Sequence, residues 1–229
     1  MFSDAEAEIF RLSMQVSLWA TFCSLPFGVA VAWFLARVEF PGKVLVDGII
    51  HLPLVLPPVV VGYLLLVVFS KNGAFGQFLS GIGIDFAFTW KGAALAAAVM
   101  AFPLMVRAIR LSIESVDQRL EMAARTLGAG PLSMFLTVTL PLILPGLIAG
   151  TVLAFARCLG EFGATITFVS NIPGETRTLP LAIYTLTQTP GSEDAAFRLV
   201  GLSVFIALIA LAISEIAARR AKRSLGMTR

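Results

Sequence analysis

Charge is scarce in this chain. Only 14% of its 229 residues are charged, whereas 58% are hydrophobic; soluble domains usually carry about 25% charged residues. A soluble helical domain needs polar faces on its helices to meet water, and this sequence lacks the residues to make them. The formal charge is +3, but no basic stripe lies on a polar face, which excludes nucleic-acid binding. The composition predicts an integral membrane protein.

Histidine and cysteine are almost absent as well. His51 is the only histidine, which excludes multi-histidine metal sites and disfavours a hydrolytic dyad; beside Leu52-Pro53 it is more typical of a hydrogen-bonding residue at a helix end. Cys23 and Cys158 both lie in apolar stretches without metal-ligand spacing, and we expect them to be packing residues. No G-x-x-x-x-G-K-[ST] loop is present to cradle a nucleotide. We therefore expect no catalytic residue and no metal site, so the chain is not predicted to be an enzyme.

Long uncharged runs dominate the chain instead. A helix that crosses the hydrocarbon needs about 20 mostly apolar residues. The expected spans are 12–36, 48–70, 86–106, 140–159 and 195–214. No linker divides them, so residues 1–229 are predicted to form one all-α domain, a polytopic bundle of about five transmembrane helices. The segment 160–195 contains short apolar pieces, and the sequence leaves open whether it forms a re-entrant or an additional span.

Prolines and glycines interrupt two of these runs. The second span contains Pro53, Pro57 and Pro58, so we expect its first half to be bent or broken. The uncharged run 126–156 is too long for one ordinary span. We expect it to divide into a short interfacial helix near 131–139 and the fourth span.

Basic residues are distributed unevenly between the loops. With the N-terminus outside, eleven of the seventeen lie on the inner side and five on the outer side, with Arg157 at a membrane end. The inner set is Arg37, Lys43, Arg107, Arg110, Arg119, Arg125, Arg219, Arg220, Lys222, Arg223 and Arg229. The outer set is Arg11, Lys71, Lys91, Arg177 and Arg198. Because short cytoplasmic loops carry the excess of Lys and Arg, the N-terminus is predicted outside, and the C-terminus and segment 112–139 in the cytoplasm.

The polar segment has the pattern of a helix–turn–helix. Asp117 can cap a helix whose exposed face would hold Glu121 and Arg125, four residues apart. Gly128 is a natural helix stop, and Pro131 suits the first turn of the next helix. The pattern predicts two short helices along the inner membrane face.

Small residues on the first of these helices suggest a partner. Ala123 and Ala124 would let another surface approach the helix closely. The alternative is an amphipathic loop helix that rests on lipid headgroups, and the spacing alone does not decide between the two.

The same segment resembles the EAA loop of ABC-importer permeases. The matching residues are Glu121, Ala123, Ala124, Gly128, Leu140 and Pro141. Met122 stands where the family often has alanine. The resemblance implies a MetI-like fold and a cytoplasmic coupling loop at about 112–139 that docks into a groove on a separate ATPase subunit. It also implies that Glu121 lies at the docking surface, that Gly128 forms the turn, and that ATP and Mg²⁺ are bound by the ATPase, with no cofactor in this chain.

Two further segments, 51–63 and 159–177, resemble molybdate-importer permeases of the bacterial inner membrane. Sulfate/thiosulfate permeases share much of the pattern, including a similar Gly-Glu-Phe-Gly stretch. The resemblance covers nearly the whole chain. It implies a homodimer that forms an oxyanion path by alternating access, served by cytoplasmic ATPases and an extracytoplasmic binding protein. Molybdate is the expected substrate and tungstate is not distinguished from it; the alternatives are sulfate/thiosulfate and a standalone secondary transporter, for which no inverted repeat is found.

The second and fourth spans supply the expected wall of the path. The candidate residues are Pro57, Pro58, Gly62, Gly146, Gly150, Arg157 and Glu161. Arg157 and Glu161 share one face of a continuous helix; they would either help an oxyanion through or form a structural ion pair, which we favour. Gly146 and Gly150 have tight helix–helix packing as their alternative.

Overall fold

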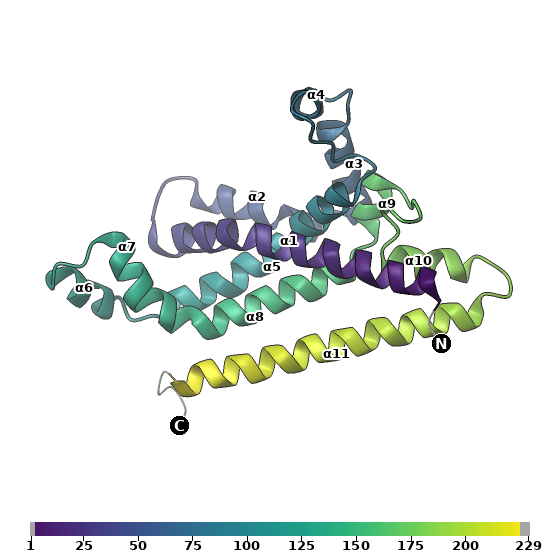
Figure 1. Ribbon diagram of the computed structural model, residues 1–229. Coiled ribbons are helices and arrows are strands. Elements are labelled where there is room, and N and C mark those ends of the chain that lie inside the picture. Colours follow the sequence, from purple (N-terminus) through teal and green to yellow (C-terminus); the bar gives the residue numbers. More distant parts are fainter. Residues whose placement is uncertain (1–2, 225–229) are drawn as a thin grey trace.

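The computed structural model describes residues 3–224, and the chain there is helical, with no strand among the described residues (Figure 1). The all-α prediction is confirmed. Arg229, counted above among the inner basic residues, lies outside the described residues.

Four helical runs in the described part are long and apolar enough to cross a membrane. They are α1 (Asp4–Arg37), α5 (Trp90–Glu114), the run Pro131–Leu159, and α11 (Glu193–Ser224), which meets the criterion over Glu193–Arg220. The fifth expected span is a bent pair, α2 (Lys43–Val55) and α3 (Pro58–Phe69), whose axes differ by 111°. Some helices are longer than the apolar segments predicted as spans, because polar helical turns extend them. At the start of α1, for example, Ser3 and Glu6 form a capping box ahead of the apolar segment.

The break in the second span follows from backbone sterics. A residue that precedes proline is disfavoured in the helical region, and Leu56 and Pro57 both precede one. Their ψ angles are 144° and 133°, and helix resumes at Pro58. The prediction of a broken second span is confirmed.

The predicted separation of an interfacial helix from the fourth span is wrong. The helix is continuous through α7 (Pro131–Met134), a π-helical turn η1 (Phe135–Thr139) and α8 (Leu140–Leu159). The Leu140 amide bonds to the Phe135 carbonyl, five residues back. Pro141 directly follows the π-helical turn and Pro145 lies within α8, and neither proline ends the helix.

The centre of the molecule is α5, which packs against α1 and α8. The N-terminal half of its buried face is built mainly from small residues, among them Ala93, Ala96, Ala97 and Ala101, and the C-terminal half from larger apolar ones. In lipid there is no hydrophobic driving force between helices, so their association depends on close backbone approach, which small residues allow. By contrast, α2 has no buried residue and α11 packs only at the edge of the bundle.

The segment 160–195 holds two short helices, α9 (Gly163–Val169) and α10 (Leu179–Thr187), neither long enough to span a membrane. The loop between them is ordered by side chains. The Thr176 hydroxyl accepts from the Ile172 amide at 2.8 Å, and Asn171 accepts from Arg177 at 2.9 Å.

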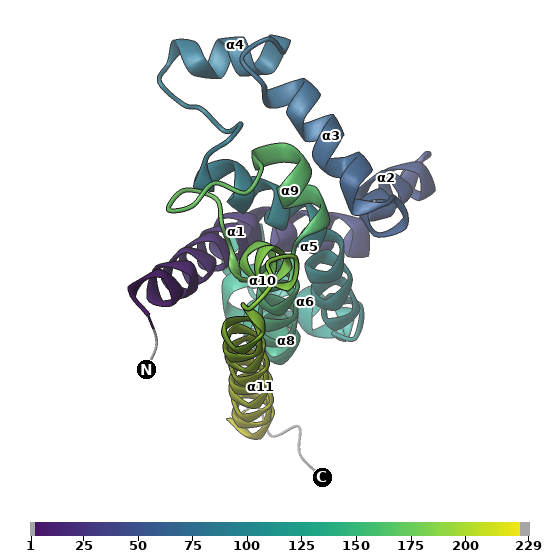
Figure 2. The same cartoon turned by 90° about the vertical axis from the view of Figure 1, so that its right-hand side faces the viewer.

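The helix α3 packs against α9 and leads to α4 (Ala74–Gly81), which extends away from the bundle as a helical arm in Figures 1 and 2. Between α4 and α5, the Ser80 hydroxyl and then the Lys71 ammonium lower the pKa of Asp85. The Asp85 carboxylate thus links the loop before α5 to Ser80 of α4 and to Lys71.

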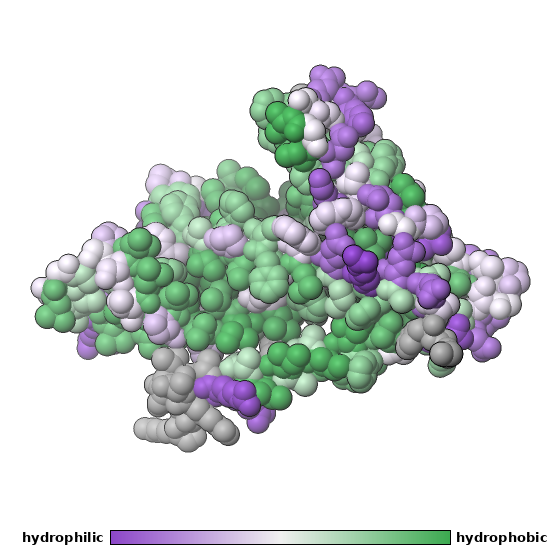
Figure 3. Space-filling model, in the orientation of Figure 1, coloured by the Kyte–Doolittle hydropathy of each residue, from purple (hydrophilic) through white to green (hydrophobic). Residues whose placement is uncertain are grey.

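Large apolar side chains cover the outside of the bundle, and Figure 3 shows them as a broad hydrophobic surface along its length. Such a surface suits lipid and protein neighbours, not water. The shorter, more polar segments lie at the two ends of the bundle. One end holds α6 (Gln118–Thr126), α7 and the C-terminal end of α11, and the other holds the N-terminus and α10 (Figure 1). This is the sorting that the distribution of basic residues predicts, and we call the α6 end the inner end.

Candidate functional site

The first helix and the turn of the helix–turn–helix at the inner end form as the sequence predicts, whereas the second helix is not short but continues into α8. The Asp117 carboxylate accepts from the Arg119 amide at 2.9 Å and caps α6. Gly128 has φ +88°, a left-handed conformation that glycine adopts without the penalty of a side chain, and it ends the helix. Pro131 begins α7. We call 117–131 the coupling segment.

The outward face of the coupling segment is mixed, with large apolar side chains exposed beside Gln118, Arg119 and Arg125. Leu127 is 89% exposed, Met122 is 56% exposed and Leu132, just beyond the segment, is 71% exposed. Ala123 is exposed and Ala124 half-buried. This face carries small and apolar side chains, but its leucines and Met122 contribute more surface than the two alanines on which the sequence prediction rested.

Glu121 faces the bundle, and its predicted place on the exposed face of the helix is wrong. The residue is 7% exposed. Its carboxylate Oε1 accepts hydrogen bonds from Arg37 Nη2 at 2.9 Å and from Thr139 Oγ1 at 2.8 Å. Glu121 therefore does not share an exposed face with Arg125, because an inward carboxylate with two buried partners sets which side of α6 faces the bundle.

Leu140 and Pro141, the remaining residues of the predicted loop, lie in the first turn of α8. Leu140 packs against the main core. They fix the helix that follows the coupling segment and are not part of its outward face.

The broken span and α9 pack closely where the path was predicted. A Cβ on Gly62 would lie 2.5 Å from the Ala164 carbonyl oxygen and 2.9 Å from Thr167 Cβ. Pro57 and Pro58 are exposed at the break itself. Gly62 is thus a packing residue between α3 and α9, while the two prolines remain candidates for the path.

Gly146 and Gly150 face α5 and do not line an open path. A Cβ on Gly146 would lie 2.3 Å from Ser112 Cβ, and one on Gly150 would lie 3.2 Å from Ala108 Cβ. Of the two interpretations of these glycines, the structure shows the packing one.

Arg157 and Glu161 form an ion pair at the outer end of α8. Arg157 Nη1 lies 2.5 Å from Glu161 Oε2; the side chains are 27% and 2% exposed. The other carboxylate oxygen accepts from the Ala164 amide at 2.8 Å, at the start of α9. A buried carboxylate with both oxygens engaged anchors α9 to α8, which supports the structural interpretation.

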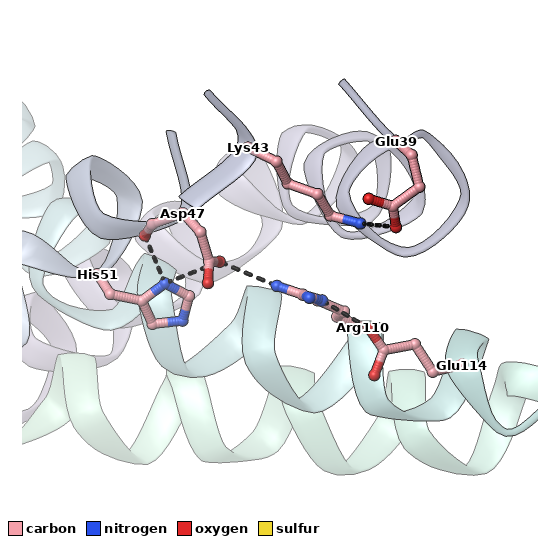
Figure 4. Close-up of polar contacts among 6 residues, drawn as sticks. All are labelled: Glu39, Lys43, Asp47, His51, Arg110 and Glu114. Atoms are coloured by element: carbon pink, nitrogen blue, oxygen red, sulfur yellow. Dashed lines mark hydrogen bonds and ion pairs between the residues drawn. The ribbon is translucent and has the colours of Figure 1, made fainter. Parts of the chain in front are cut away.

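A polar cluster at the inner end of α2 was not predicted. Arg110 of α5 donates to Asp47 at 3.0 Å and to Glu114 at 2.7 Å (Figure 4). His51 Nδ1 lies 2.9 Å from the Asp47 carbonyl oxygen, one helical turn back, as expected for a residue that bonds within its own helix. Since α2 buries no residue, this cluster is its polar attachment to α5.

No signal in the sequence links these partners. Asp47 and Arg110 are 63 residues apart, and Arg37 and Glu121 are 84 apart. The sequence shows these charged residues only as isolated charges beside apolar runs. The basic ones served solely to predict the orientation of the chain in the membrane. Among the described residues no group of three or more His, Cys, Asp or Glu is placed to hold a metal ion.

The fold is that of ABC-importer membrane subunits. The structure superposes on a bacterial ABC transporter involved in import of the acidic polysaccharide alginate with a TM-score of 0.71, at 21% identity, over 97% of this chain and 80% of that one. It superposes equally well, TM-score 0.71 at 15% identity, on an inward-facing MetNI methionine ABC transporter, over 96% of this chain and 99% of that one. The predicted MetI-like fold is confirmed.

The chain belongs to the family described as binding-protein-dependent transport system inner membrane component, whose model matches residues 24–223. It is 62% identical to the molybdenum transport system permease protein ModB of Escherichia coli K12, over 98% of both chains, and 55% identical to ModB of Haemophilus influenzae, over 96% of this chain and 97% of that one. The sulfate transport system permease protein CysT of Salmonella typhimurium is 36% identical, over 95% of this chain and 78% of that one. The predicted inner-membrane, multi-pass localisation and transport role are confirmed.

Proposed function

We propose that the chain is the membrane subunit of an ATP-driven importer and forms, as a homodimer, the path for molybdate. The observation that carries the substrate is the identity of 62% over 98% of both chains with a molybdenum permease, against 36% with a sulfate permease. Tungstate is a close chemical analogue and is expected to share the path.

The ATPase docks on the coupling segment, and ATP and Mg²⁺ bind to that separate subunit, so the chain itself is not an enzyme. The outward face of α6, with Met122 and Leu127 strongly exposed and Ala123 beside them, supports this role. Exposed apolar side chains at the polar inner end suit a protein groove; a helix resting on lipid headgroups is the alternative, and co-purification with the ATPase separates the two.

Selectivity lies largely in an extracytoplasmic binding protein that delivers the oxyanion. Of the residues that the structure describes, Arg157 is the membrane-depth cation predicted for the path, and Glu161 neutralises it. The path is accordingly lined by apolar and small side chains, with Pro57 and Pro58 at its break.

Uptake into proteoliposomes tests the substrate. Vesicles that contain the chain and its ATPase, supplied with binding protein, are expected to accumulate molybdate only with ATP, and tungstate is expected to compete while equimolar sulfate does not. Accumulation without the ATPase would favour a standalone carrier, and accumulation of sulfate would favour the sulfate/thiosulfate alternative.

Co-purification tests the docking surface. Leu127→Asp is expected to weaken association with the ATPase because it places a charge in an apolar contact. Ile82→Asp, at a position that is 60% exposed and lies outside the segment, is expected to leave association intact. Equal association of both variants and the unaltered chain would contradict docking at this segment.

A further inference from the structure

The coupling segment is attached to the bundle through one buried side chain. Met122 of α6 and Leu127, which follows it, have exposed side chains, whereas Glu121 is 7% exposed. Carboxylates are almost never buried without a partner. In the described part of the chain, Glu121 is the α6 side chain that hydrogen-bonds to another element; the Thr126 hydroxyl bonds within α6.

The two partners of Glu121 come from two different spans. Arg37 is the last residue of α1, and Thr139 is the last residue of the π-helical turn that leads into α8. Both donate to the same carboxylate oxygen, at 2.9 and 2.8 Å. One oxygen on α6 thus joins the inner ends of α1 and α8.

Burial makes this connection costly to break on one side. The Arg37 and Glu121 side chains are each 10% exposed, so salt and water screen their attraction little. Arg37 Nε is buried without a partner among the described residues. Glu121 is the carboxylate paired with Arg37. Removal of either charge would leave the other buried and unpaired.

We propose that Arg37 and Thr139 are positioning residues that hold the coupling segment in register with α1 and α8, so that force applied to α6 reaches both spans. This inference rests on the proposed docking of the ATPase at the segment. Glu121 acts here through Arg37 and Thr139, inside the chain, and does not contact the ATPase.

The test separates docking from coupling. Arg37→Met keeps the apolar stem and removes the charge, and Thr139→Val removes only the hydroxyl. Each variant is assayed for co-purification with the ATPase, for ATP hydrolysis and for molybdate accumulated per ATP. The control is Glu39→Gln, which breaks the exposed Glu39–Lys43 pair at the same end of the molecule.

Arg37→Met is expected to retain the ATPase but to lower molybdate accumulated per ATP by about tenfold, within the range typical of coupling between two sites. Arg37→Met combined with Glu121→Gln is expected to recover part of the loss, because no unpaired charge remains. Thr139→Val, the mildest change, is expected to lower molybdate accumulated per ATP by a smaller factor. Glu39→Gln is expected to leave that ratio unchanged.

A second measurement does not depend on transport. Trypsin is expected to cleave the purified Arg37→Met chain after the exposed Arg125 faster than the unaltered chain, because α6 has lost its anchor. Unchanged cleavage together with an unchanged transport ratio would overturn the proposal. So would loss of ATPase binding in Glu121→Gln with normal behaviour of Arg37→Met, since Glu121 would then contact the ATPase. If the unaltered chain itself fails to bind the ATPase, the proposed function fails while the cleavage result still judges the anchor.

Discussion

The pair Arg157–Glu161 offers the sharpest test of whether an intramembrane charge serves the cargo or the fold. Replacement of Glu161 by alanine removes the counter-ion of Arg157 and the acceptor of the Ala164 amide. Breaking a buried pair costs ~3–5 kcal/mol. Because Arg157 retains 27% exposure, about 2 kcal/mol is the better figure, and the lost acceptor adds ~1 kcal/mol.

The expected cost of Glu161→Ala is therefore about 3 kcal/mol, or roughly 10 °C in the unfolding temperature of the purified chain. The double variant Arg157→Met with Glu161→Gln keeps an acceptor for Ala164 and leaves no unpaired charge. We expect its unfolding temperature and its molybdate uptake to lie near those of the unaltered chain. A folded double variant that has lost uptake would refute the structural interpretation and assign Arg157 to the oxyanion.

Three other substitutions follow from local geometry. Gly62→Ala should destabilise the chain by about 1–3 kcal/mol in thermal unfolding, because the added Cβ would meet the Ala164 carbonyl oxygen at 2.5 Å and backbone cannot yield as a flexible side chain does; wild-type stability would show that α3 and α9 are not in this contact. Gly128→Ala should cost ~1–2 kcal/mol because the residue has φ +88°, although nothing lies within 4 Å of the added carbon. It should also weaken ATPase association by disordering the turn. An unchanged variant would mean that the turn does not require the left-handed conformation. Asp47→Asn should free α2 from Arg110 and increase cleavage or labelling of α2 in the purified chain, and equal labelling of both forms would show that the cluster does not attach this helix.

Features set by local chain geometry were predictable from the sequence. The prolines at 57 and 58 dictate the break in the second span, and Asp117, Gly128 and Pro131 dictate the start of α6, its end and the start of α7. Each acts on the backbone within a few residues of itself, so no tertiary information was needed.

Features set by packing between distant segments were not predictable. The spacing of Glu121 and Arg125 favoured a shared exposed face, but Arg37, 84 residues away, turns Glu121 inward. Gly146 and Gly150 carry the small-residue signal of close approach without stating which neighbour approaches, and the structure identifies it as α5. Pro141 and Pro145 suggested a boundary, but the helix runs through both.

Photo-crosslinking from position 127 tests the central claim most directly. Leu127 is the most exposed large apolar residue of the coupling segment, so a photo-reactive side chain there should react with whatever lies on that face. In membranes that contain the ATPase and the binding protein, we expect adducts with the ATPase from position 127 and none from position 197 on the outer part of α11. Adducts from position 127 with lipid alone, or with the extracytoplasmic binding protein, would contradict the account.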